Sequence, residues 1–152
     1  IHAVLEFQNG ALITLGASWD VCAHRHENME LYGSDGSLYL PDPNFFGGEV
    51  LLAGQGDDAT QIAPRDHPFA IPNAKDGQGT DRANYRCAGL ADMAAAIAAD
   101  RPHRCSLELA THVVEVMTAI LQAGETGQVM TMTTTCERPE VLDPDQARAL
   151  MV

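Results

Sequence analysis

The spacing of the apolar residues changes from that of strands to that of helices between the first third of the chain and its later part, and this change limits the possible folds more than any other feature. In the first 53 residues, short β-rich segments with alternating apolar residues are separated by turn residues, which is typical of strands. Later the apolar residues recur at Leu90, Met93, Ala94 and Ile97, which is the spacing of one helix face. Strands followed by helices predict an α+β fold with an open, mostly antiparallel sheet.

The first two strands are expected to form a hairpin. Segments 1–7 and 11–19 are apolar and β-rich, and Asn9-Gly10 between them is favoured where two turn residues need positive φ. With this two-residue turn, the numbers of paired residues sum to 19. The apolar residues then divide between the two faces of the hairpin, so both faces need cover.

Further strands are expected at 28–32, 37–40 and 49–53, and the β-branched segment 129–135 is expected to return to the sheet. Residues 54–81 are rich in Gly, Pro and Asp and have no sustained period. We interpret them as an irregular excursion of the kind that often lines a site.

Three helices are expected. The first contains Leu90 to Ile97 and stops at Pro102, and the second follows Ser106, a good N-cap. A short third helix begins at Asp143-Pro144. The second helix carries an apolar stripe of Leu109, Val113, Val116, Met117 and Ile120. Two long helices can cover one face of the sheet, which leaves the other face available for oligomerisation or for another domain.

Net charge excludes two classes of partner. The 152 residues contain nine Lys plus Arg and 21 Asp plus Glu, for a formal charge of −12. Such a chain repels nucleic acid and anionic lipid, so neither is an expected partner. The four cysteines form no metal or disulfide motif and are interpreted as reduced residues of a cytoplasmic, soluble protein.

His24, His26 and Glu30 are the candidate metal ligands. On a strand, residues i and i+2 share a face, and two imidazoles with a carboxylate suit a transition metal. The spacing resembles the first motif of the cupins, but the second motif is missing and two long helices fit that barrel poorly. We expect no metal, and keep a stand-alone cupin-like metal-binding or carbohydrate-binding protein as the alternative function.

Two other patterns are assigned no ligand. Glu108, His112 and Glu115 share a helix face, which we interpret as solvated or as an interface. The segment 54–59 matches the dinucleotide fingerprint GxGxx[GA] superficially, but Pro64 and the neighbouring aspartates oppose the helix and the anion that this fingerprint needs. We therefore expect a turn there and no cofactor bound by this chain.

Many weak motifs in order resemble the C-terminal domain of the Gfo/Idh/MocA oxidoreductases. The segments that carry the resemblance are Leu5 to Ala11, Ala17 to Asp20, Met29 to Gly33, Gly36 to Leu38, Pro41 to Gly48, Tyr85-Arg86, Gly89 to Met93, Arg101 to Arg104, Glu108 to Met117 and Glu137 to Pro139. The resemblance spans roughly residues 1–142 and implies a substrate and oligomerisation domain, which joins an NAD- or NADP-binding Rossmann domain in the parent.

The resemblance also implies that this chain lacks the family's catalytic lysine and its Rossmann domain. The family's catalytic Lys stands in a Glu-Lys-Pro segment, whereas the only lysine here, Lys75, lies in a different context. The chain starts inside an expected strand, so we expect residues 1–152 to be a single-domain fragment without the Rossmann domain. The parent would be an NAD(P)-dependent dehydrogenase of a sugar, polyol or related alcohol, and this fragment would have no catalytic residue and no activity alone.

The candidate substrate-binding residues are His24, Asn44, Tyr85 and Arg86. His24 lies near the end of an expected strand region, and Asn44 lies in a loop bounded by Pro and Gly. Tyr85 and Arg86 stand where the irregular excursion becomes the first helix, so they could face a cleft toward the missing domain. We also expect a homo-oligomer that forms through a sheet face.

Overall fold

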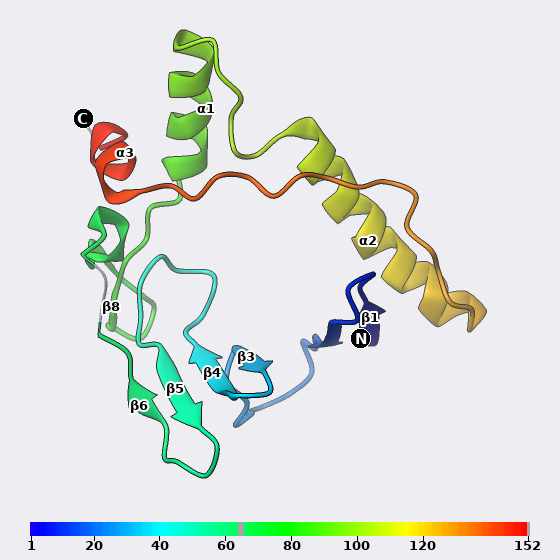
Figure 1. Ribbon diagram of the computed structural model, residues 1–152. Coiled ribbons are helices and arrows are strands. Elements are labelled where there is room, and N and C mark those ends of the chain that lie inside the picture. Colours follow the sequence, from blue (N-terminus) through cyan, green and yellow to red (C-terminus); the bar gives the residue numbers. More distant parts are fainter. Residues whose placement is uncertain (64–65, 152) are drawn as a thin grey trace. The chain divides into compact units, whose positions relative to one another are not determined.

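The computed structural model describes residues 1–63 and 66–151, which form a mixed α+β structure (Figure 1). The strands are β1 (His2–Glu6), β2 (Leu12–Gly16), β3 (Met29–Tyr32), β4 (Gly36–Leu40), β5 (Leu51–Gly54), β6 (Thr60–Gln61), β7 (Ala74–Lys75) and β8 (Asp81–Arg82). The helices are α1 (Ala88–Ala98), α2 (Leu107–Thr126) and α3 (Pro144–Ala149), with a 3-10 turn, η1 (Pro68–Ala70). None of the described helices is both long and apolar enough to cross a membrane.

The strands form three separate antiparallel sheets, in place of the single open sheet that the sequence led us to expect. Their orders are β1-β2, β3-β4-β5-β6 and β7-β8, and none closes into a barrel within the described ranges. The chain divides into two compact units, which we describe separately. Unit 1 contains residues 1–25 and 107–137, and unit 2 contains residues 26–106 and the chain from residue 138.

The β1-β2 hairpin of unit 1 forms, but our predicted register is wrong by one residue. Ala3 pairs with Leu15, so paired numbers sum to 18 and not to 19. The Gly10 backbone N–H donates to the Phe7 carbonyl at 2.8 Å, which closes a turn one residue longer than expected. Gly10 has φ of 85°, whereas Asn9 is not among the described residues with positive φ. The connection is therefore a three-residue loop with one left-handed glycine, because a two-residue hairpin turn of type I′ or II′ would need positive φ at Asn9.

This register changes which residues share a face of the hairpin. Directly paired residues point to the same side. The apolar residues that now share one face are Ile1, Ala3, Leu5, Phe7, Ile13, Leu15 and Ala17. The opposite face carries His2, Val4, Glu6, Leu12 and Thr14. The hairpin therefore has one apolar face and one mixed face, so the predicted division of the apolar residues between the two faces is wrong.

Helix α2 begins directly after Ser106, as expected, and ends before Gly127, whose φ is 67°. Its predicted apolar stripe is only partly right, because Val113 and Met117 are exposed while Val116 and Ile120 are half-buried. The stripe with least exposure also includes His112 and Glu115, which contact the segment that follows the helix.

The expected strand at 129–135 is not a strand in the structure. Within 128–137 no backbone hydrogen bond to another described segment is formed. Burial still alternates, with Met130, Met132, Thr134 and Cys136 half-buried. The segment therefore has the side-chain pattern of a strand. Its hydrogen-bond partners, however, are side chains of α2 and not the backbone of a neighbouring strand.

In unit 2, the predicted strands β3, β4 and β5 form as an antiparallel meander. The excursion at 54–81 is mostly irregular, as expected, but it also supplies β6, β7, η1 and the start of β8. Short two-residue strands carry too little apolar periodicity to be read from sequence. The β5 strand ends at Gly54, and a turn through Gly56 leads into β6.

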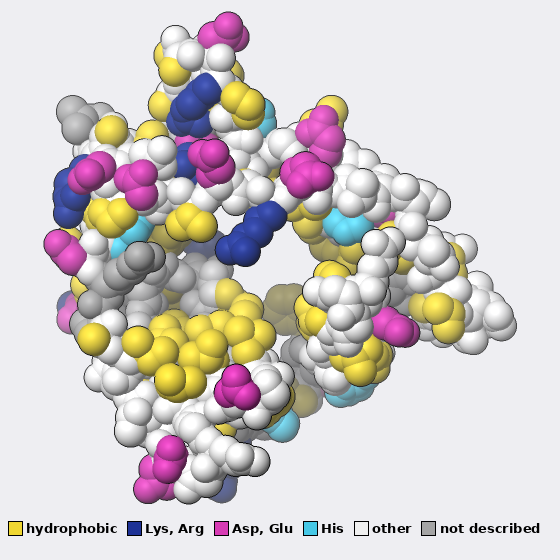
Figure 2. Space-filling model, in the orientation of Figure 1, with side chains coloured by type: hydrophobic (Ala, Val, Ile, Leu, Met, Phe, Trp, Pro, Cys, Tyr) yellow, Lys and Arg dark blue, Asp and Glu magenta, His cyan; other side chains and the backbone are white. Residues whose placement is uncertain are grey.

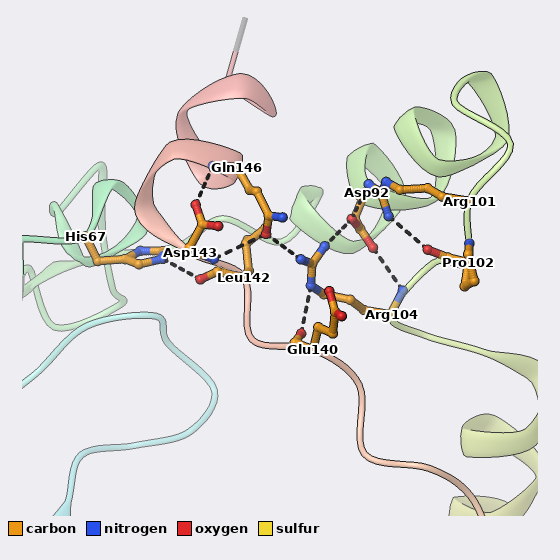
Figure 3. A network of polar contacts seen from close by, with 9 residues as sticks. All are labelled: His67, Asp92, Arg101, Pro102, Arg104, Glu140, Leu142, Asp143 and Gln146. Carbon is orange, nitrogen blue, oxygen red and sulfur yellow. Dashed lines mark hydrogen bonds and ion pairs between the residues drawn. The ribbon is translucent and has the colours of Figure 1, made fainter.

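A polar network anchored on Asp92 joins α1 to the C-terminal part of unit 2 (Figure 3). The Asp92 carboxylate is buried and accepts from Arg101 Nη2 at 2.9 Å, from Arg104 Nη1 at 2.6 Å and from the Arg104 backbone N–H at 3.0 Å. Arg104 also donates to the Glu140 carbonyl at 2.9 Å and to Gln146 Oε1 at 2.6 Å. One arginine thus connects three segments.

The predicted start of α3 is confirmed in detail. Asp143 is the N-cap, its carboxylate accepts from the backbone of Asp145 and Gln146, and Pro144 occupies the first helical turn. The Gln146 side chain reaches back to the Asp143 backbone, which completes a capping box. Nearby, His67 contacts the Leu142 carbonyl at 3.2 Å and so connects η1 to this segment.

The described residues leave much apolar surface uncovered. The chain exposes 12266 Å², whereas two free-standing compact units of these sizes would together expose about 9,000 Å². The buried apolar residues of the described chain are Pro68, Phe69, Ala83, Ala96, Ala119 and Ala147. Figure 2 shows apolar side chains gathered over β4 and β5 on the face in view. Each unit therefore presents apolar side chains that a partner could cover.

Candidate functional site

Three aromatic rings from distant parts of unit 2 come together and form the centre of the candidate site. The Phe69 and Tyr85 rings stack with centroids 4.8 Å apart, and the Phe46 ring meets the Tyr85 ring edge-on at 5.9 Å. Phe69 is buried, Tyr85 is half-buried and Phe46 is exposed. We call Phe46, Phe69 and Tyr85 the aromatic cluster, and it offers an accessible apolar edge supported by a buried ring.

The loop that contains Asn44 is tied to this cluster. The Asn44 backbone N–H donates to the Asp42 carboxylate at 2.9 Å, which fixes a tight turn, and the Asn44 side chain remains exposed. Two residues later, the Phe46 backbone N–H donates to the Ala83 carbonyl at 2.9 Å. The Asn44 loop therefore lies against the segment that leads to Tyr85.

Tyr85 is held in place at both ends. Its hydroxyl donates to the Ile71 carbonyl at 2.9 Å. Its backbone follows Asn84, which exchanges hydrogen bonds with Asn73: the Asn84 N–H donates to Asn73 Oδ1 at 2.7 Å and Asn73 Nδ2 donates to the Asn84 carbonyl at 3.1 Å. Because the hydroxyl is already paired, Tyr85 offers its ring in preference to its hydroxyl for binding.

Arg86 follows Tyr85 and precedes α1, whose N-cap is Cys87. The Arg86 side chain is exposed, and no described residue forms an ion pair with it. Asn44, Tyr85 and Arg86 are thus all in unit 2, on or next to segments of the aromatic cluster.

His24, the fourth candidate, lies in unit 1 in an exposed stretch without regular secondary structure. The structure therefore does not place it in the unit that holds the other three. The neighbouring His26 and residues 23–28 are not in a strand either, so the expected strand geometry for a metal pair with Glu30 is wrong. Over the described ranges, no three His, Cys, Asp or Glu side chains gather in a way that could hold a metal ion.

The sequence interpretation missed a second polar cluster, on α2 of unit 1. The Glu115 carboxylate accepts from the backbone N–H of Thr133 at 2.8 Å and of Thr134 at 2.9 Å, and from both hydroxyls. These bonds, first those from the two hydroxyls and then those from the two amides, lower the pKa of Glu115 to about 2. His112 Nδ1 lies 2.9 Å from the Thr134 hydroxyl oxygen.

The role of this α2 cluster is to attach the extended segment to the helix. Because the Thr134 hydroxyl donates to Glu115, the contact with His112 requires that Nδ1 carry the proton. The sequence did place His112 and Glu115 on one helix face, but their threonine partners are 18 to 22 residues away along the chain. A carboxylate that is saturated with hydrogen bonds is a poor candidate for proton transfer, so we assign this cluster a structural role.

Two shallow hollows in the described residues lie away from the aromatic cluster. One, in unit 2, is lined by the turn between β3 and β4 together with Leu38 and Leu52. The other, in unit 1, is lined by Leu107, Glu108, Thr111, Thr134 and Thr135. Neither is lined by a candidate substrate-binding residue, whereas Tyr85 is part of the aromatic cluster.

Comparisons with protein-family models, with curated proteins and with solved structures found no match to this chain.

Proposed function

We propose that this chain is the substrate-binding and oligomerisation domain of an NAD(P)-dependent oxidoreductase that acts on a sugar, polyol or related alcohol. The observation that carries the proposal is the contact between the Asn44 loop and Tyr85, which are about 40 residues apart in sequence. Both segments were selected from sequence as substrate-facing, and the Phe46 ring and backbone connect them. Aromatic edges, an exposed amide and an arginine are groups that bind hydroxylated ligands.

The uncovered apolar surface supports a role within a larger assembly. In unit 1, Leu15, Ile13 and Phe7 share one hairpin face and remain 37%, 46% and 48% exposed. Covering such a face with a second copy is the usual way in which a homo-oligomer removes it from water. In the assembled protein we propose that a second copy covers this apolar face of the β1-β2 hairpin.

The chain itself supplies no nicotinamide site in this proposal. The Gly54 to Gly56 segment connects β5 to β6, and the Asp57 N–H donates to the Gly54 carbonyl at 3.3 Å. The element that follows this segment is the strand β6 and not a helix whose N-terminal amides could meet a pyrophosphate, and the Asp57 carboxylate would repel one. The missing Rossmann domain of the parent would bind NAD or NADP and would supply the hydride chemistry.

Kinetics of the full-length parent test this assignment. Alanine substitutions of Asn44, Tyr85 and Arg86 should each lower kcat/KM for the true substrate by about tenfold, or 1.4 kcal/mol. His24→Ala, in unit 1, is the variant with which the other three are compared. A loss of kcat/KM in His24→Ala would support His24 as a substrate-binding residue too. Parental kinetics in all four variants, with unchanged stability, would show that other residues build the pocket.

A further inference from the structure

Arg86 directly follows Tyr85 of the aromatic cluster and forms no ion pair with any described residue. In unit 2 the described cations that form ion pairs are Lys75, Arg82, Arg101, Arg104 and Arg148. Arg86 and Arg138 form none with any described residue. With 21 acidic residues available to nine basic ones, an arginine without a carboxylate partner leaves its guanidinium open for a ligand.

The position of Arg86 is fixed by its neighbours. The Asn73 and Asn84 exchange holds the backbone immediately before Tyr85, and the Tyr85 ring and hydroxyl are both engaged. The next turn is tied too, because the Ala88 N–H donates to the Tyr85 carbonyl at 2.9 Å. The Arg86 backbone therefore lies between two hydrogen-bonded anchors, beside the cluster proposed to contact substrate.

The net negative charge of the chain makes a local cation such as Arg86 necessary for binding an anionic ligand. At −12, the chain repels dissolved anions, so an anionic substrate needs a local positive group to bind. A guanidinium binds a carboxylate through two parallel hydrogen bonds, which is stronger and more directional than a neutral contact. The exposed Asn44 amide can bind hydroxyls, which a simple carboxylate lacks.

We propose that the substrate is a sugar acid, a polyhydroxylated carboxylate, whose carboxylate binds Arg86 and whose hydroxylated chain lies against the aromatic cluster and Asn44. This inference rests on the proposed function and narrows its substrate class. Arg86 is then a specificity-determining residue, because it discriminates between a carboxylate and the corresponding neutral alcohol group.

Two matched ligands and two matched variants test the proposal. Gluconate and sorbitol differ only in that one terminal carbon is a carboxylate in gluconate and a primary alcohol in sorbitol. Their binding to this chain can be followed by amide shifts of residues 44–46 and 84–88 in NMR titrations at low ionic strength, where screening is weak. The variants are Arg86→Gln and, as the control, Arg138→Gln, at an arginine of unit 2 that also forms no ion pair with any described residue.

We expect the unchanged chain and Arg138→Gln to bind gluconate about tenfold more tightly than sorbitol, and Arg86→Gln to lose this preference. Equal binding of the two ligands by the unchanged chain, or a preference retained in Arg86→Gln, would overturn the sugar-acid inference and leave the proposed site intact. Binding of neither ligand would overturn the inference together with the substrate role of the aromatic cluster.

Discussion

Replacing Asp92 with asparagine should destabilise unit 2 far more than the same change at an exposed aspartate. Asp92 is 5% exposed and accepts three hydrogen bonds, two from Arg104 and one from Arg101. An asparagine has one acceptor oxygen and one NH₂ group in the same space. Whichever way it is oriented, its NH₂ faces either the guanidinium groups or the Arg104 backbone N–H, so one donor meets another.

The magnitude follows from the exposure of the partners. The Arg101 side chain is 40% exposed, so its contribution is that of a surface pair, at about 0–1 kcal/mol. The Arg104 side chain is 21% exposed, and losing one hydrogen bond to a charged group costs about 1.5–3 kcal/mol. We expect a total of about 1.5–4 kcal/mol, which lies below the cost of breaking a fully buried ion pair because both arginines retain contact with water.

Acid titration provides a second readout for Asp92. Burial raises the pKa of this carboxyl, but the Arg104 backbone N–H, the Arg101 hydrogen bond and the charges of both arginines outweigh burial and lower the pKa below 3.8. A lowered folded-state pKa stabilises the protein above the unfolded-state value, and this stabilisation is lost as pH falls through the folded-state value. The difference in the free energy of unfolding between the unchanged chain and Asp92→Asn should therefore be largest at pH 7 and should shrink below about pH 4.

Urea unfolding monitored by far-UV circular dichroism measures the effect. With a slope of about 1–3 kcal/mol per molar urea, Asp92→Asn should lower the midpoint by about 1–2 M. The control is Asp145→Asn, which removes an ion pair to Arg148 whose aspartate is 94% exposed, and it should change stability by about 0.5 kcal/mol or less. Equal urea midpoints for Asp92→Asn and Asp145→Asn would contradict the stabilising role of the buried Asp92 carboxylate. A stability difference between the unchanged chain and Asp92→Asn that persists unchanged in acid would also contradict it.

Three further outcomes are expected. Glu115→Gln should loosen segment 129–135, seen as faster amide exchange at Thr133 and Thr134. In the unchanged chain, a carbon-detected titration should give Glu115 a pKa of about 2, and a pKa above 4 would contradict the contacts. Below that value the attachment to α2 should be lost, because its stabilisation disappears as pH falls from 4.5 through about 2. Gly10→Ala should cost about 1 kcal/mol because its φ is 85°, while Gly77→Ala, in open space without positive φ, should be nearly neutral, and equal effects would argue against the three-residue loop. The chain should self-associate in light scattering after gel filtration, and a strictly monomeric species at every concentration would mean that its apolar hairpin face is covered internally.

Local signals predicted the elements whose ends are specified by a few neighbouring residues. The α3 start was readable because Asp143, Pro144 and Gln146 carry the cap, the restricted φ and the capping-box partner within four positions. The β3-β4-β5 meander was readable for a similar reason, since turn residues separate its strands. Such elements depend little on distant parts of the chain.

Features that depend on distant partners were missed or misjudged. Asn9-Gly10 suits both a two-residue turn and a three-residue loop, and the choice between them decides the hairpin register. This one local ambiguity therefore changed which residues of the two strands share a face. Segment 129–135 has strand composition, yet Glu115 takes two of its N–H groups. The burial of Asp92 depends on arginines nine and 12 residues later, which no local pattern connects to it.

The most direct test of the proposed function is to express the complete reading frame that contains this chain and to follow nicotinamide absorbance with polyols, sugars and sugar acids as substrates. The account predicts that the encoded protein contains a glycine-rich strand-turn-helix segment before Ile1 and that it oxidises or reduces at least one of these compounds with NAD or NADP. A complete frame without a nucleotide-binding domain, or a full-length protein that binds neither cofactor, would contradict it.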